Sequence, residues 1–223
     1  MLPVLQTDPK SSRLERALKE RVRGEVRFDA HSRYLYSTDA SLYQIIPQGV
    51  VIPRDAQDVA ETLSLAAEAN IPVVPRGGGT SLAGQAVGDA IILDFAKYMN
   101  RVISIDPERR TAIVQPGLRL DRLNRATAKH GLHFGPDPQT IRQCALGGMI
   151  SNNSCGSRSV VYGKTGDHVH SLKCMLPDAD QVHFGPVDRA AVATMPGREG
   201  EIARQVSALL EPRRDGILDR YPK

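Results

Sequence analysis

A glycine-rich stretch at residues 75–85, PRGGGTSLAGQ, most constrains the fold of this chain because it follows directly on a predicted strand. Apolar residues at 72–74 predict that strand, and residues 49–53 predict another short, buried strand. Between them, residues 54–71 predict an amphipathic helix with Asp55 as its N-cap. The order predicts a βαβ unit whose second strand runs into a flexible loop.

The composition of this loop is typical of a phosphate or pyrophosphate cradle. Glycines let several backbone N–H groups approach one anion without interference from a Cβ atom. Thr80 and Ser81 add hydroxyl donors, and Arg76 adds a positive charge. A mobile surface loop is the alternative interpretation.

Two common phosphate-binding motifs do not fit the loop. Gly79 and Gly84 have the spacing of a P-loop, but Gln85 and Ala86 replace its lysine and hydroxyl residue. In the dinucleotide fingerprint, Leu82 stands where the third glycine belongs. Both motifs are therefore excluded.

A second segment rich in glycine, asparagine and serine follows about 70 residues later, at residues 146–169. Its sequence is LGGMISNNSCGSRSVVYGKTGDHV. Small residues allow a ligand to approach the backbone closely. Two such segments in one domain predict a ligand long enough to be held in two places.

The remaining pattern mixes strands and helices and predicts an α+β domain. Strands are expected at 90–95, 101–106 and 111–116, a loop at 134–140, and a hairpin at 171–184 that turns at PDAD. Helices are expected at 12–22 with Ser12 as N-cap, at 119–131 with Gly131 at C′, and at 198–212 as the last element.

Composition excludes several other classes of protein. The net charge is only +4 and the chain has ten Phe and Tyr and no Trp, which argues against a nucleic-acid partner. No apolar run is long enough for a transmembrane segment, and the first residues do not resemble a signal peptide. Three cysteines predict no disulfide framework. We expect a cytoplasmic protein, with peripheral association with the membrane as an alternative.

The paired motifs PRGGGTSLAGQ and LGGMISNNSCGSRSVVYGKTGDHV resemble those of the FAD-linked oxidase family, the vanillyl-alcohol oxidase or PCMH type. The resemblance extends over residues 36–185 and is strongest to the branch of D-lactate, glycolate and D-2-hydroxyglutarate dehydrogenases. It implies a PCMH-type FAD-binding domain of two α+β subdomains, here without its C-terminal part and cap domain. We therefore expect an N-terminal fragment, with a helix and linker at 1–40 and the truncated FAD-binding domain at 41–223.

The resemblance also implies which residues bind the cofactor. The first loop would hold the pyrophosphate, the second segment and the loop before it would line the flavin and ribityl chain, and Val169 would lie in a strand against the adenine. Thr80 follows the glycines where some relatives carry a histidine linked covalently to FAD, so noncovalent binding is expected. The implied FAD-binding residues are Arg76, Gly77, Gly78, Gly79, Thr80, Ser81, Gly84, Gln85, Asp137, Pro138, Thr140, Gly147, Gly148, Ser151, Asn153, Ser154, Gly156 and Val169.

For the whole protein, the resemblance implies oxidation of a 2-hydroxy acid such as D-lactate to the 2-oxo acid by hydride transfer to flavin N5. Substrate would be bound through the missing domain, the catalytic residues would lie outside this chain, and an iron–sulfur centre or a quinone would accept the electrons. Two alternatives remain: a non-catalytic nucleotide-binding module, and a flavoenzyme of the same fold with different chemistry.

Other reactive side chains suggest no further site. His168 and His170 would share one face of a strand, but no nearby carboxylate or thiolate completes a metal site, so no metal is expected. Cys155 fits a small residue in a tight contact better than a nucleophile.

Overall fold

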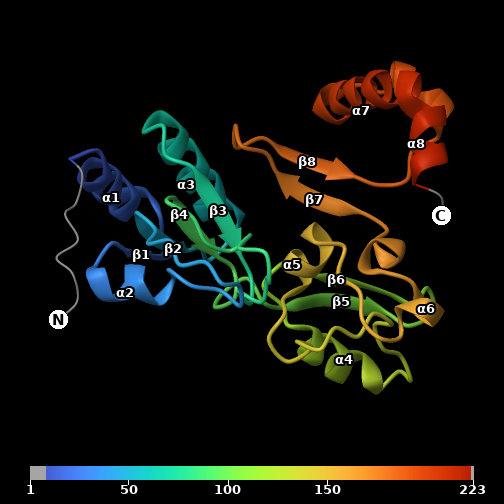
Figure 1. Cartoon of the computed structure of the whole chain (residues 1–223), viewed down its shortest axis with the longest axis horizontal. Coiled ribbons are helices and arrows are strands. Elements are labelled where there is room, and N and C mark those ends of the chain that lie inside the picture. The colour runs from blue at the N-terminus through green and yellow to red at the C-terminus, as the bar shows by residue number, and fades with distance from the viewer. Residues whose placement is uncertain (1–8, 222–223) are drawn as a thin grey trace. The chain divides into compact units, whose positions relative to one another are not determined.

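The computed structural model describes residues 9–221, which form two units (Figure 1). The first unit contains residues 9–169 with the short segment 177–179, and the second contains residues 170–176 and 180–221. All residues implied in cofactor binding belong to the first unit. No helix among the described residues is long and apolar enough to cross a membrane.

A four-stranded sheet forms one half of the first unit. In spatial order the strands are β1 (Glu25–Arg27), β2 (Gly49–Ile52), β4 (Ile91–Asp94) and β3 (Val73–Arg76). The two central strands, β2 and β4, are buried at every position. Both β2 and β3 run parallel to β4, which confirms the predicted βαβ unit, and β1 is antiparallel to β2.

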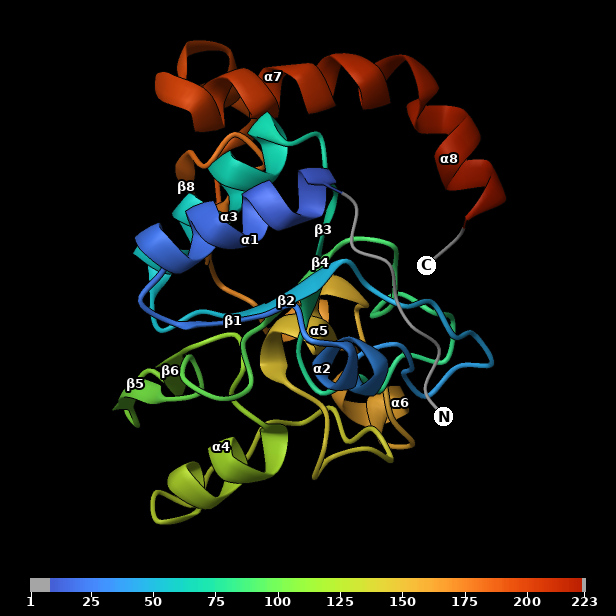
Figure 2. The ribbon, with the colours of Figure 1, turned by 90° about the vertical axis from the view of Figure 1, so that its left-hand side faces the viewer.

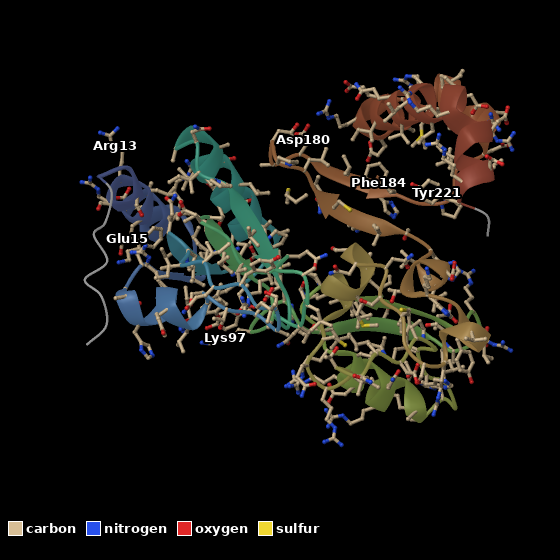
Figure 3. All side chains as sticks on the ribbon, in the orientation of Figure 1. Arg13, Glu15, Lys97, Asp180, Phe184 and Tyr221 are labelled. Atoms are coloured by element: carbon tan, nitrogen blue, oxygen red, sulfur yellow. The ribbon has the colours of Figure 1, made fainter. Side chains whose placement is uncertain are left out.

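Helices cover both faces of this sheet. The helices α1 (Pro9–Arg21) and α3 (Ala56–Glu68) pack together on one face, and α2 (Ala30–Leu35) lies on the other (Figures 1 and 2). Asp55 caps α3 as predicted, because its side chain accepts hydrogen bonds from the backbone N–H groups of Gln57 and Asp58. Side chains fill the space between α1, α3 and the sheet (Figure 3).

The other half of the first unit contains a hairpin and short helices around a second core. The hairpin joins β5 (Val102–Asp106) to β6 (Thr111–Val114). The apolar core contains Leu118, Leu120, Leu123, Cys144, Leu146 and Met149. The helices of this half are α4 (Leu120–Ala128), α5 (Leu146–Ser151), α6 (Ser159–Tyr162) and the 3₁₀ helix η1 (Thr165–His168).

The second unit begins with the predicted hairpin, formed by β7 (Leu172–Met175) and β8 (Gln181–Phe184). The helix α7 (Gly197–Leu210) is joined to it by a hydrogen bond from the His183 backbone N–H to the Glu199 carboxylate, 2.9 Å long. The unit also contains the 3₁₀ helices η2 (Arg189–Thr194) and η3 (Glu211–Arg213), and α8 (Arg214–Arg220).

Several local predictions are wrong. Helix α1 begins at Pro9, so Ser12 lies inside it and is not its N-cap. The last element is α8, because the chain turns at Pro212 and continues as a further helix. Gly131 has the predicted positive φ, but it lies two residues after the C-cap Lys129, one residue beyond C′.

Residues 1–40 contain more than a helix and linker. Strand β1 pairs with β2 and so joins this segment to the main sheet. Residues 1–8 of the segment lie outside the described residues.

Candidate FAD-binding site

Five consecutive backbone amides, from Gly77 to Ser81, line the first glycine-rich loop. Within residues 9–221, none of them donates a hydrogen bond to a protein acceptor. Gly79 has φ +63°, a conformation that a glycine adopts without strain. Successive backbone N–H groups without protein acceptors can together bind an anion, so this row of free amides is suited to an anionic ligand.

The guanidinium of Arg76, at the end of β3, binds other groups of the protein. It donates hydrogen bonds to the carbonyl oxygens of Thr38 and Ala86, each 2.9 Å long, and lies 5.3 Å from the centre of the Tyr36 ring. The Tyr36 hydroxyl in turn donates to the Asp94 carboxylate over 2.6 Å. Arg76 therefore joins the two ends of the loop to each other and to the segment that contains Tyr36 and Thr38.

Asp94, paired with Arg76 across β3 and β4, is buried. Its second oxygen accepts a hydrogen bond of 2.8 Å from the Ala96 backbone. Burial, followed by the hydrogen bond to Asp94, raises the pKa of Tyr36, so its hydroxyl remains a donor at neutral pH. No sequence motif indicated this network, because Tyr36, Arg76 and Asp94 are 18 to 58 residues apart.

Ser81, Gly84 and Gln85 shape the far side of the loop. The Ser81 hydroxyl accepts hydrogen bonds from the backbone N–H groups of Ala83 and Gln85, at 3.2 and 3.3 Å, and donates to the Gln85 side chain. Gly84 has φ +76°, and a Cβ atom there would lie 2.7 Å from the Tyr43 ring. These residues support the loop, whereas the Thr80 hydroxyl has no partner among the described residues.

The fold brings the two glycine-rich segments together. A Cβ atom on Gly77 would lie 2.8 Å from the Ala145 Cβ, and one on Gly78 would lie 2.0 Å from the Gln143 carbonyl oxygen. The absence of side chains is therefore what lets the first loop contact the start of the second segment. That one ligand is held by both segments stays a prediction.

Gly147 and Gly148 lie in the first turn of α5 rather than in a loop. Gly147 packs on Pro116 and donates a hydrogen bond of 2.8 Å to its carbonyl oxygen. A Cβ atom on Gly148, by contrast, would meet no heavy atom within 4 Å, and the Gly148 amide has no acceptor within residues 9–221. Gly148 thus borders open space and supplies a further free amide.

The loop at 134–140 contacts the end of the second segment. The Asp137 carboxylate accepts a hydrogen bond of 2.9 Å from the Arg158 backbone N–H, and a Cβ atom on Gly156 would lie 2.3 Å from the Asp137 backbone. The carbonyl oxygens of Pro138 and Thr140 accept from Ile141 and Gln143, which closes the turn that follows.

Three polar residues of the second segment form hydrogen bonds within that segment. The Asn153 side chain accepts a hydrogen bond of 2.8 Å from the Gly166 N–H, and the Ser154 carbonyl accepts from the Thr165 N–H and hydroxyl. The Ser151 hydroxyl donates to the Gly147 carbonyl over 3.0 Å. The side chains of Ser151 and Asn153 are therefore engaged within the protein.

Val169 does not lie in a strand. It is the C-cap of η1, and β7 begins only at Leu172, because the preceding residues close a 3₁₀ turn. His168 lies in that turn, with its ring nitrogen 2.7 Å from the Tyr162 carbonyl oxygen, so it does not share a strand face with His170. No cluster of metal-ligating side chains occurs in the described part of the chain.

A cavity of about 150 Å³ opens beside the first loop. It extends from Gly78 to the beginning of α4, where Arg119 and Arg122 contribute to its wall. Sequence reasoning missed these arginines because they lie in an ordinary amphipathic helix pattern.

The family model of the FAD binding domain matches residues 47–185 of the chain. The chain belongs to this family. The chain is 38% identical over 207 residues to a D-2-hydroxyglutarate dehydrogenase of Pseudomonas putida, covering 90% of this chain and 21% of that protein. It is 37% identical to the glycolate oxidase subunit GlcD of Bacillus subtilis, covering 74% of this chain and 36% of that subunit.

A mitochondrial cytochrome-type D-lactate dehydrogenase of Saccharomyces cerevisiae is 34% identical, over 67% of this chain and 26% of that protein. The chain thus spans between about a fifth and about a third of the length of these curated relatives.

Solved structures confirm the PCMH-type fold. An alkyldihydroxyacetonephosphate synthase superimposes with a TM-score of 0.71 at 23% identity, over 84% of this chain and 40% of that one. A p-cresol methylhydroxylase does so with a TM-score of 0.71 at 19% identity, over 88% and 38%. At these identities the likeness shows the fold alone.

The geometry of the FAD-binding domain fits its cofactor, FAD. Free amides at Gly77–Ser81 and Gly148 match a diphosphate, which offers acceptors and no donors. Open space at Gly148 leaves room next to the loop.

Proposed function

We propose that this chain is the FAD-binding part of a flavin-dependent dehydrogenase that oxidises a 2-hydroxy acid to the 2-oxo acid. The observation that carries the proposal is the row of free amides from Gly77 to Ser81, set against Gly148 of the second segment. The relatives are named for D-2-hydroxyglutarate, glycolate and D-lactate, which favours 2-hydroxy acids as the substrate class.

The residues of this chain would bind and orient the cofactor. The amides from Gly77 to Ser81 would donate to the diphosphate, while Arg76, held by Thr38, Ala86 and Tyr36, fixes the path of the loop. Bound flavin supplies a two-electron acceptor for the hydrogen on the hydroxyl-bearing carbon. We propose that binding is noncovalent, because the loop carries Thr80, a poor nucleophile, after its glycines.

We propose that the residues that bind the substrate and remove its hydroxyl proton belong to polypeptide beyond this chain. The whole enzyme would pass its electrons to an iron–sulfur centre, a quinone or a cytochrome, and would act in the cytoplasm or at a membrane surface. The name of the yeast relative includes a cytochrome, which supports an acceptor of this class.

The test is reduction of bound flavin by candidate substrates without oxygen. A polypeptide containing this chain and the remainder of its enzyme is loaded with FAD and mixed with D-2-hydroxyglutarate, D-lactate or glycolate. Loss of the oxidised-flavin absorbance with at least one of them is expected. If all three leave the spectrum unchanged while dithionite reduces it, the substrate class is wrong.

A further inference from the structure

The cavity beside the first loop is the starting point for a further assignment. Its wall combines Gly78 with residues from three other segments. These are Ala96 and Asn100 after β4, then Gly117, Arg119 and Arg122 around the start of α4, and Gln143 and Ala145 before α5. Its volume of about 150 Å³ is well below the roughly 300–1,000 Å³ of a pocket for a drug-sized ligand. It therefore accommodates one polar group of a larger molecule.

The charge on the cavity wall is positive. Arg122 is exposed, and within residues 9–221 its guanidinium has no hydrogen-bond or ion-pair partner. Arg119 lies 3.5 Å from the Asp121 carboxylate, but its Nε atom is buried without a hydrogen bond.

Asp121 is the acidic residue nearest to these arginines along the helix, and it is shared. Its other oxygen pairs with Arg125 at 2.8 Å. One carboxylate between Arg119 and Arg125 leaves the charge of Arg122 uncompensated. The side-chain amide of Asn100 donates its hydrogen bonds to the carbonyl oxygens of Ala96 and Lys97.

We propose that Arg119 and Arg122 bind the diphosphate of FAD together with the backbone amide of Gly78, which lines the same cavity, with Arg122 as the main charge. This inference rests on the proposed function, because it takes FAD as the ligand. Amides alone supply only partial charges to a group with two negative charges, and Arg76 is already engaged. The planar guanidinium matches phosphate oxygens.

The test compares FAD affinity in Arg122→Gln with that of the unchanged chain, by flavin fluorescence at low and moderate salt. The variant is expected to bind FAD about tenfold more weakly, since charge-assisted hydrogen bonds to phosphate are the strong ones. Its affinity should also depend less on salt, because one ionic contact has gone. Inorganic pyrophosphate should compete with FAD in the unchanged chain and compete less well in the variant.

Lys129→Gln is the matched control, because it removes one positive charge from the other end of α4, outside the cavity. It should bind FAD within about twofold of the unchanged chain. Circular dichroism of each variant checks folding, and Arg122 is exposed enough for its loss to leave the fold intact.

Equal loss of affinity in both variants would assign the effect to net charge and overturn the proposal. Unchanged affinity in Arg122→Gln would overturn it while leaving FAD binding established. If the unchanged chain binds no FAD, the proposed function fails and this inference fails with it.

Discussion

The variant Gly148→Ala tests whether the space beside Gly148 is needed for cofactor binding rather than for packing of the protein. Gly148 lies in the first turn of α5, and a Cβ atom there meets no heavy atom within 4 Å. Alanine is favoured over glycine in a helix by about 0.5–1 kcal/mol, so the protein without FAD should be equally or slightly more stable. The new methyl group would stand in the open space that we assign to the bound cofactor.

Crowding a filled site by one methyl group costs about 1–3 kcal/mol, which corresponds to roughly 5- to 150-fold weaker FAD binding. Calorimetric titration gives the affinity, and differential scanning fluorimetry without FAD gives the stability. Gly216→Ala in α8 is the control, because its Cβ also meets nothing within 4 Å and it lies in the other unit. Unchanged FAD affinity in Gly148→Ala would refute the reasoning, as would a lower melting temperature without FAD.

Three further perturbations test the loop and the sheet. Gly78→Ala should weaken FAD binding and also lower the melting temperature without FAD, because its Cβ would lie 2.0 Å from a backbone oxygen of Gln143; a fully stable variant would contradict this packing. Tyr36→Phe should lower the free energy of unfolding in urea by about 1 kcal/mol, because it removes the hydrogen bond to Asp94. Lys97, Tyr98 and Arg27 hold the pKa of Glu25 near 2, below its ordinary 4.5. Stability from the ionised Glu25 is thus present above about pH 4.5 and lost as pH falls through about 2, so Glu25→Gln should destabilise at pH 7 by about 1 kcal/mol and less at pH 3. An equal difference in urea unfolding at both pH values would exclude this origin.

Local pattern was sufficient for the elements that lie at the centre of the fold. The strands β2 and β4 are continuous apolar runs because both of their faces are buried, and α3 has a clear N-cap. Strand β1, with only three residues, has too little pattern to be recognised. Val169 was misplaced because a 3₁₀ turn and the start of a strand have similar local sequences.

Within the candidate site, the sequence indicated both glycine-rich segments but not the structural role of each residue in them. Gly78 and Gly148 look alike in the sequence, yet one packs against Gln143 and the other borders open space. Arg76 appeared to be a free charge, whereas its partners Thr38 and Ala86 come from segments that only the tertiary fold brings close. Such roles depend on contacts between distant residues, which periodicity does not encode.

The row of free amides is tested most directly by NMR of the backbone amides during titration with FAD. We predict that the signals of Gly77, Gly78, Gly79, Thr80 and Ser81 move downfield and exchange more slowly with solvent, because each gains an acceptor, with Gly148 among the other signals that move. If FAD binds while these five signals stay in place and others move, the diphosphate lies elsewhere and the account of this loop is wrong.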